Sequence, residues 1–229
     1  HLVPFRIFAA SEPDMEGARV VRGEWVEEDV EQRTLPIIGD CVESYVEHAM
    51  GRKFLAFGVN VRHCEEMLRR FMAAGIQCAL YTYQTGDAER ERILTEFRKP
   101  DSYIRGLVSI SAISKGFDVP DVGAIIMCRP LRKGFAEYIQ ILGRGLRRHP
   151  DKTDCLVLDH SGNMLRFWTR MMDFFAEGAK ELDDGARKTR KQEKPRAAEP
   201  RKCPACHHVH PPRPFCPHCG HEYPNRMSG

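Results

Sequence analysis

The fold of this chain is decided by residues 53–81, which read KFLAFGVNVRHCEEMLRRFMAAGIQCALY. The apolar run at 53–59 is typical of a buried strand. From Val61 onwards the apolar residues recur three or four positions apart, which is the period of an α-helix, and Gly75 follows as a residue that ends helices. A second short apolar run occupies 77–81. The stretch therefore predicts a strand, a helix and another strand in succession.

The same alternation continues on both sides of this stretch. Further strands are expected at 106–111, 123–128 and 154–159. Further helices are expected at 35–50, 87–98, 135–148 and 164–176. Strands that alternate with helices form a parallel sheet with helices on both faces. The predicted fold class is therefore α/β.

Composition divides the chain into four parts. Residues 1–50 are a lead-in segment that ends in a helix, and residues 51–176 form the α/β domain. Residues 177–202 are charged and show no apolar periodicity, which is typical of a flexible linker. Residues 203–223 hold four of the nine cysteines, and the other five lie singly in apolar stretches, as reduced core thiols do.

Charge is distributed unevenly along the chain. Residues 187–229 contain ten Lys and Arg against three Asp and Glu, and residues 1–186 contain 25 against 29, so the two parts carry +7 and −4. A basic tail indicates an anionic partner, most often nucleic acid, although a solvated linker has the same composition. No apolar run approaches the length of about 18 residues that a membrane-spanning helix needs. The N-terminus also lacks a secretory signal, so we expect a cytoplasmic protein without a membrane partner.

The sequence QILGRGLRR at 140–148 concentrates the strongest functional signal. At about 100° per residue, Arg144 and Arg147 fall within about 40° of Gln140, and the apolar residues of the same helix fall on the opposite side. Two forked guanidinium groups held side by side suit a polyphosphate, although solvated surface arginines follow the same pattern. The two glycines each cost about 1 kcal/mol in a helix interior, which indicates that something approaches the backbone closely.

This helix belongs to a block of motifs. The loop SKGFDVP (114–120), the strand GAIIMCRP (123–130) and the helix at 140–148 are consecutive. Together they resemble motifs V and VI of superfamily 2 helicases, the second having the pattern Q-x-x-G-R-x-x-R, and residues 53–76 resemble motif IV. The stretch from CRPLRKG to RRHPDK, followed by LDHSGN, is similar to the branch that contains RadD-type repair helicases, phage helicases and type III restriction subunits.

The resemblance covers about residues 1–175. It implies a RecA-like parallel sheet, the C-terminal motor domain of an ATP-dependent DNA helicase or translocase, and a setting in DNA repair, nucleoid-associated if bacterial, or phage-encoded. Arg144 and Arg147 would be arginine fingers on the γ-phosphate of ATP, and Gln140 would lie near that phosphate or the attacking water. The implied nucleotide contacts are Gly116, Asp118 and Gly143.

Weaker implied contacts to the nucleic-acid backbone are Asn60, Arg62, His63, Ser109, Ser111 and Lys115. Hydroxyl, amide and cationic donors of this kind bind phosphate without reading sequence. Lys115 departs from the family pattern, because many relatives have glutamate there. A lysine at this position would contact a phosphate or remain solvated, and both alternatives stay open.

Two motifs that an ATPase needs are absent from the sequence. No G-x-x-x-x-G-K-[ST] loop and no D-E-x-[DH] box occur, so no part of this chain would cradle the β-phosphate and Mg²⁺. Because the chain also begins without Met, we expect it to be part of a longer polypeptide whose N-terminal RecA-like domain binds ATP and Mg²⁺, and to be inactive as an ATPase alone. The alternative is a non-catalytic adaptor that binds DNA or protein.

The four C-terminal cysteines form two knuckles, CPAC at 203–206 and CPHC at 216–219. Four thiolates from two such turns close tetrahedrally around Zn²⁺, so Cys203, Cys206, Cys216 and Cys219 are the predicted ligands of a structural zinc ribbon. Five nearby histidines are alternative ligands, but two complete knuckles favour four cysteines. We expect Cys216→Ser to unfold the ribbon locally without disturbing the larger domain.

Overall fold

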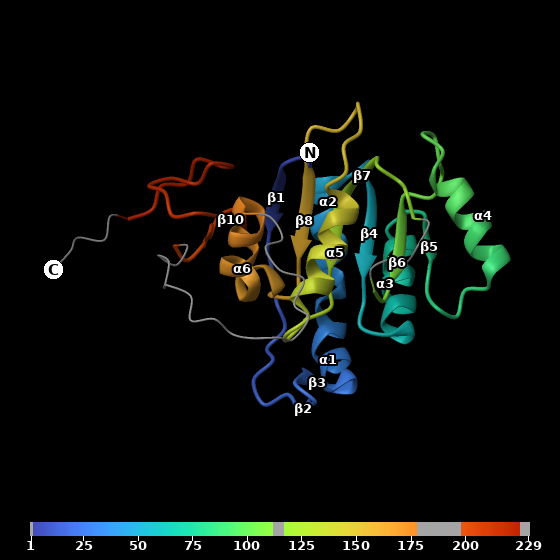
Figure 1. The fold of residues 1–229 in the computed structure, drawn as a ribbon, viewed down its shortest axis with the longest axis horizontal. Coiled ribbons are helices and arrows are strands. Elements are labelled where there is room, and N and C mark those ends of the chain that lie inside the picture. Colours follow the sequence, from blue (N-terminus) through green and yellow to red (C-terminus); the bar gives the residue numbers. More distant parts are fainter. Residues whose placement is uncertain (1, 112–116, 178–197, 225–229) are drawn as a thin grey trace.

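The computed structural model describes residues 2–111, 117–177 and 198–224 (Figure 1). Its helices are α1 (Glu27–Thr34), the 3₁₀ turn η1 (Leu35–Ile37), α2 (Ile38–Ala49), α3 (Val61–Ala73), α4 (Asp87–Phe97), α5 (Phe135–Gly145) and α6 (Asn163–Glu177). Its strands are β1 (Phe5–Phe8), β2 (Val20–Val21), β3 (Glu24–Trp25), β4 (Lys53–Phe57), β5 (Cys78–Leu80), β6 (Gly106–Ser109), β7 (Val122–Met127), β8 (Cys155–Asp159), β9 (Arg201–Lys202) and β10 (His208–His210).

The predicted α/β fold is confirmed. One eight-stranded sheet has the order β5-β6-β4-β7-β8-β1-β10-β9, and its strands from β5 to β1 are parallel. Every residue of β4, β6, β7 and β8 is buried, as expected of parallel strands that are covered on both faces. The apolar runs in the sequence are therefore continuous because neither face of these strands meets water.

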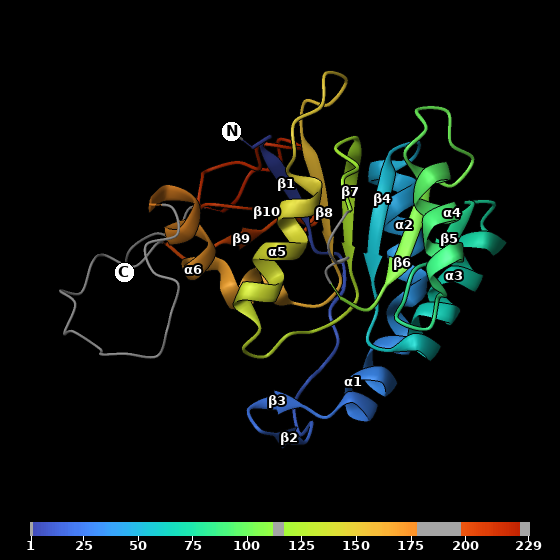
Figure 2. The ribbon, with the colours of Figure 1, turned by 45° about the vertical axis from the view of Figure 1, so that its right-hand side comes forward.

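Helices cover the sheet in two layers. One core cluster packs α2 and α3 against one face through side chains such as Tyr45, Met67 and Phe71. The other packs α4, α5 and α6 against the opposite face through side chains such as Phe97 and Tyr138. Figure 2 shows α5 in front of the central strands and α2 behind them. This is the predicted arrangement of helices on both faces.

Local signals in the sequence explain where individual helices begin and end. Asn60 precedes α3 and accepts a hydrogen bond from the backbone N–H of His63 at 2.9 Å, which satisfies one of the free donors at the helix N-terminus. Gly75 follows α3 with φ of +76°, a left-handed conformation that glycine adopts without strain. The helix is thus bounded by the two residues best suited to those positions.

The lead-in segment contributes more than a helix to the fold. Strand β1 inserts between β8 and β10, pairing Phe5 with Cys155 and Ile7 with Val209. The β2–β3 hairpin and α1 follow it before α2 begins. The four-part division of the chain remains a prediction, although β1 shows that residues 1–50 supply a strand to the main sheet.

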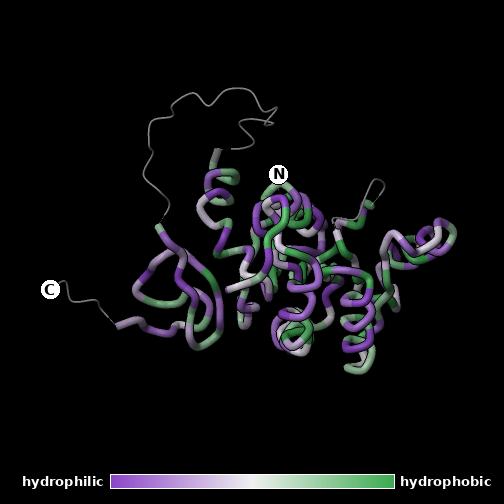
Figure 3. Tube along the Cα trace, turned by 90° about the horizontal axis from the view of Figure 1, so that it is seen from below, coloured by the Kyte–Doolittle hydropathy of each residue, from purple (hydrophilic) through white to green (hydrophobic). Residues whose placement is uncertain are grey.

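The C-terminal segment joins the same sheet. Strand β10 pairs antiparallel with β1, and β9 pairs antiparallel with β10. Val209 is 2% exposed and belongs to the core cluster on the α5 and α6 face. Figure 3 shows the segment at one side of the body, with hydrophilic and hydrophobic stretches in close succession. Most of the predicted linker, residues 178–197, lies outside the described residues.

Candidate functional site

Helix α5 carries two of the three residues of the predicted phosphate-binding face. Tyr138, Ile141 and Leu142 are buried against the sheet, which turns Gln140 outwards to an exposed position. Arg144 follows one turn later and is half-buried. The apolar side of the helix is therefore packed as predicted, and the polar side faces away from it.

The two glycines of α5 differ in what surrounds them. A Cβ on Gly145 would lie 2.7 Å from both the Sγ of Cys155 and the Cγ1 of Ile125, whereas a Cβ on Gly143 would meet no atom within 4 Å. The sequence indicated that some group approaches the backbone of this helix closely. At Gly145 that group is the sheet, through Cys155 and Ile125. Gly143 faces open space and leaves the backbone accessible.

This contrast gives a matched pair of substitutions. Gly145→Ala is expected to lower the free energy of unfolding by about 1–3 kcal/mol, because the buried side chains of Cys155 and Ile125 must move to admit the methyl group. Gly143→Ala is expected to raise it by up to about 1 kcal/mol, because alanine is the better helix former and has room. Urea unfolding of both variants measures the difference. Equal effects of the two substitutions would contradict the packing described for Gly145.

The prediction that this helix extends to Arg148 is wrong. Helix α5 ends at Gly145, with Leu146 as its C-cap residue. Pro150 disfavours helical geometry at the residue before it, and the ammonium group of Lys152 donates to the Gly145 carbonyl at 2.6 Å, which satisfies the helix terminus. Arg147 therefore lies beyond the helix, and the angular argument that placed it on one helical face with Gln140 and Arg144 does not apply.

Arg147 instead reaches the loop after β6. Its Nη1 donates to the Phe117 carbonyl at 3.1 Å and to the carboxylate of Asp118. The structure thus joins a residue of the predicted arginine pair to a residue of the predicted nucleotide-binding loop. Lys115 and Gly116, in the same loop, lie outside the described residues.

Arg144 has no such partner. Its Nε is buried and makes no hydrogen bond with any described residue. Burial lowers the pKa of Arg144, and the positive charge of Arg147 lowers it further. An unpaired guanidinium in a partly desolvated site attracts anions strongly.

The predicted donors of the motif IV loop are occupied by α1. Glu31 accepts from Nδ2 of Asn60 at 3.0 Å and from Nε of Arg62 at 2.5 Å. Burial raises the pKa of Glu31, but the hydrogen bonds from Arg62 and Asn60 outweigh this effect and leave it below its usual value. His63 is fully buried, and its Nε2 lies 2.9 Å from Oγ1 of Thr34. The contacts of these three residues with nucleic acid remain predictions.

The predicted serine contacts lie at the end of β6. Ser109 is buried, and its hydroxyl donates to the Ser111 carbonyl at 3.3 Å, whereas Ser111 is exposed. No pattern in the sequence pointed to Glu31 and Thr34, because their contacts depend on α1 packing beside the motif IV loop. The acidic residue facing Asn60 and Arg62 became visible only in the structure.

The four predicted metal ligands converge. The Sγ atoms of Cys203, Cys206, Cys216 and Cys219 all lie within 4.8 Å of one another. Two of the Sγ–Sγ distances are 3.7 Å, close to the ~3.8 Å edge of a tetrahedron with Zn–S bonds of about 2.3 Å. The donor set therefore fits a closed structural zinc site.

The two knuckles have the same local geometry. In each, the N–H of the residue after the second cysteine donates to the carbonyl of the first at 2.9 Å, from His207 to Cys203 and from Gly220 to Cys216. Both donor residues have positive φ, +59° and +75°. Burial raises the pKa of Cys203, but the N–H groups of Cys206 and Ala205 outweigh it and bring that pKa to about 6. A thiolate at neutral pH is the form that binds a metal.

A second group of metal-binding side chains overlaps the first. His208, His210 and Cys216 also lie within 4.8 Å of one another. However, His210 is engaged on both ring nitrogens, with the Tyr223 hydroxyl at 2.9 Å and the Pro211 carbonyl at 2.7 Å. Four free cysteines are therefore the better ligand set.

Comparisons with known proteins identify the family of domains that this chain resembles. Residues 37–149 match the family described as the helicase conserved C-terminal domain. The 51.5 kDa protein of a Lactococcus phage (isolate 7-9) is 26% identical over 97% of this chain and 48% of its own length. A Schizosaccharomyces pombe protein named as a mitochondrial ATP-dependent helicase, irc3, is 31% identical over 56% of this chain and 21% of its own length. This chain thus spans about half or less of these relatives.

Solved structures show the same fold. A fragment of a type I restriction enzyme from Vibrio vulnificus, titled as an HsdR subunit, has a TM-score of 0.61 at 19% identity and covers 77% of this chain and 35% of its own. The C-terminal domain of the DEAD-box protein Dbp5 has a TM-score of 0.51 at 14% identity over 76% of this chain and 85% of its own. Within the described residues, no helix is both long and apolar enough to cross a membrane. Residues 37–149, just under half of the chain, thus correspond to a helicase conserved C-terminal domain of the superfamily 2 type.

Proposed function

We propose that this chain is the second motor domain of an ATP-dependent DNA helicase or translocase, and that Arg144 is its arginine finger. The observation that carries the proposal is the half-buried guanidinium of Arg144, whose Nε has no hydrogen-bond partner among the described residues. An anion supplied by another domain would satisfy it. A purely structural arginine of similar burial would be expected to have a partner within the chain.

Each site residue then has a distinct task in phosphoryl transfer. Arg144 stabilises the charge that spreads over the γ-phosphate oxygens in the transition state. Arg147 is held by Asp118, so it reaches a phosphate only by sharing or exchanging that carboxylate. Exposed Gln140 orients the attacking water. ATP and Mg²⁺ would be bound mainly by an N-terminal RecA-like domain of the same polypeptide, and Mg²⁺ would neutralise the phosphate charge there.

The isolated chain provides the first test. We expect no ATP turnover above background, with or without single-stranded DNA, because no residue of its sequence forms a Walker A loop. Adding the N-terminal domain, expressed separately or as part of the complete polypeptide, should restore DNA-stimulated hydrolysis in a phosphate-release assay. Turnover by the chain alone at ordinary helicase rates would refute the proposal.

The C-terminal ribbon would add to the nucleic-acid track. The four cysteines support a structural Zn²⁺ that fixes the two knuckles against β1, and the +7 charge of residues 187–229 supports an anionic partner. The alternative, a non-catalytic adaptor on the same fold, is favoured by the closed contact between Arg147 and Asp118. An adaptor would retain DNA binding and would show no dependence of ATPase activity on Arg144.

A further inference from the structure

A cavity of about 440 Å³ lies where the ribbon meets the motor domain. Three elements supply its walls: β1 through Phe5 to Ile7, α6 through Trp168, Met171 and Met172, and β10 with the loop and knuckle after it. Its volume falls within the range of about 300–1,000 Å³ that is typical of small-ligand sites. The cavity therefore exists only because β10 pairs with β1.

The charge of this cavity is one-sided. Its lining includes Arg6, Arg213 and three histidines, and no aspartate or glutamate. Arg6 donates through Nε to Asp154 at 2.7 Å. Arg213 is exposed and forms no ion pair with any described residue. The rim therefore suits a ligand with negative charge.

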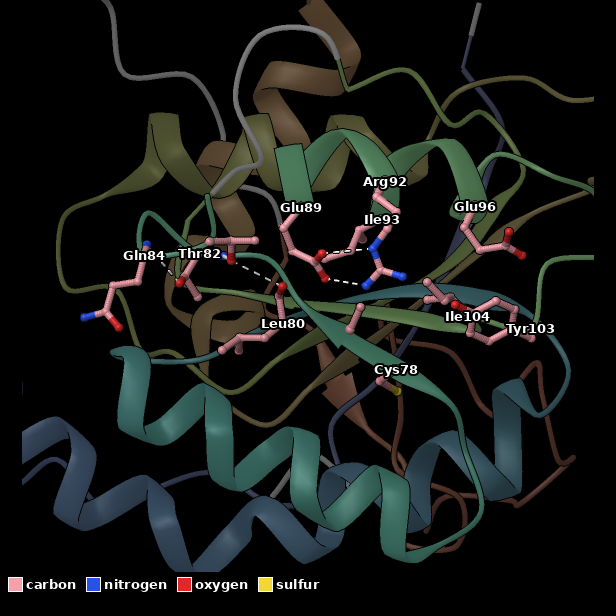
Figure 4. A pocket seen from close by; sticks show the side chains of 12 residues that line it. Cys78, Leu80, Thr82, Gln84, Glu89, Arg92, Ile93, Glu96, Tyr103 and Ile104 are labelled. Carbon is pink, nitrogen blue, oxygen red and sulfur yellow. Dashed lines mark hydrogen bonds and ion pairs between the residues drawn. The ribbon is translucent and has the colours of Figure 1, made fainter. Parts of the chain in front are cut away.

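Another large cavity provides a contrast. It has a volume of about 510 Å³ and lies between β5 and α4 (Figure 4). Glu89 and Glu96 line it, and its arginine, Arg92, is paired with Glu89 at 2.6 Å. The charge there is already balanced by carboxylates. Of these two cavities, only the one at the ribbon is lined by an arginine, Arg213, that forms no ion pair with a described carboxylate.

The walls of the ribbon cavity are apolar and aromatic. Trp168 is 5% exposed and Val209 2% exposed. His208 and His210 stack with ring centroids 5.5 Å apart, and His218 lies 5.6 Å from His208. His208 is 8% exposed, and its Nδ1 has no hydrogen-bond partner in the described part of the chain. A buried polar atom of this kind is stabilised by a ligand that hydrogen-bonds to it.

We propose that this cavity receives an unstacked base of a single DNA strand, with the adjoining phosphate on Arg213. A base combines a planar face for the aromatic walls with edge groups for the unpaired histidine nitrogen. An acidic peptide would satisfy Arg213 but would leave the aromatic walls unused. The inference rests on the proposed function, because it assigns part of the nucleic-acid track to the junction between motor domain and ribbon.

Binding measurements on the zinc-loaded chain test whether Arg213 contacts a DNA phosphate. Arg213→Glu is expected to weaken binding of a fluorescein-labelled dT12 oligonucleotide about tenfold and to lower the salt dependence of log Kd by about one phosphate contact. Arg213→Lys should retain most of the affinity. The control is Arg22→Glu, an exposed arginine at the turn of the β2–β3 hairpin. Equal losses for the two glutamate variants would show that only overall charge matters and would overturn the site.

Photo-crosslinking tests whether a DNA base enters the cavity. A dT12 oligonucleotide with one 5-bromodeoxyuridine is expected to crosslink to the peptide that contains Trp168. Crosslinks confined to other peptides, or displacement by polyglutamate as effective as by unlabelled dT12, would overturn the proposal. Zinc content is measured for each variant, so that a misfolded ribbon is recognised. All measurements are made without ATP, so a negative result leaves the test of Arg144 unaffected.

Discussion

Replacing Arg144 by alanine is expected to lower the rate of ATP hydrolysis by the complete motor about 10³–10⁵-fold while DNA binding is retained. This is the usual contribution of an arginine finger to phosphoryl transfer, and it corresponds to about 4–7 kcal/mol of transition-state stabilisation. The reason lies in the unsatisfied Nε of Arg144 and in the burial that lowers its pKa. Steady-state ATPase assays with saturating single-stranded DNA measure the effect.

Two companion variants make the result interpretable. Arg148→Ala removes an exposed arginine four residues later and should leave the rate within about twofold of the parent, because surface substitutions rarely have large effects. Arg144→Lys keeps the charge but loses the planar fork, so a large part of the defect should remain. Normal ATPase activity of Arg144→Ala would favour the adaptor function instead.

Removing the zinc ion that we propose at the four cysteines is expected to unfold more than the ribbon. Binding of structural zinc contributes about 10–16 kcal/mol to folding of small zinc domains, which is comparable with the whole stability of an ordinary domain, about 5–15 kcal/mol. Without it, β9 and β10 should separate from the sheet. Because Ile7 pairs with Val209 and the Ala9 N–H donates to the His207 carbonyl at 3.0 Å, the outer edge of β1 would then lose its partner.

Hydrogen exchange measures this coupling. Chelation, or Cys216→Ser, should raise the exchange rates of amides at 5–9 and 201–210, while β4 and β7 remain protected at the centre of the sheet. The control is Cys78→Ser, because Cys78 lies on β5 at the opposite end of the sheet from β9. Unchanged protection of β1 in protein shown to be free of zinc would contradict the coupling. This expected loss of protection at β1 differs from the expectation, drawn from the sequence, that the larger domain is undisturbed, and the exchange rates decide between the two.

The central part of the fold was predictable because its signals are local. Strands β4, β6, β7 and β8 are buried on both faces, so their apolar runs stand out against the helical periodicity between them. The predicted helix beginning at Val61 ends within one residue of its observed end at Ala73. The four cysteines were equally clear, because knuckle spacing reflects the coordination geometry of one metal.

The parts that were missed depend on partners distant in sequence. Strand β1 has only four residues, FRIF, and its place in the sheet, between β8 and β10, follows from pairing with strands about 150 and 200 residues away. The position of Arg147 depends on Lys152, which binds the carbonyl at the end of α5, and on Asp118, which pairs with Arg147. Helical periodicity in the sequence reveals neither contact. Likewise, the acidic residue beside Asn60 and Arg62 comes from α1, about thirty residues earlier in the chain.

The position of β1 also determines the order in which the polypeptide completes its fold during synthesis. Phe5 pairs with Cys155 and Ile7 with Val209, so within this domain β1 leaves the ribosome about 150 residues before β8, the first strand that pairs with it, has been made. At about 5–20 residues per second this delay lasts roughly 8–30 s. During that time the apolar side chains of FRIF lack the strands that cover them in the folded domain, and the sheet is complete only when β8 and β10 have paired with β1.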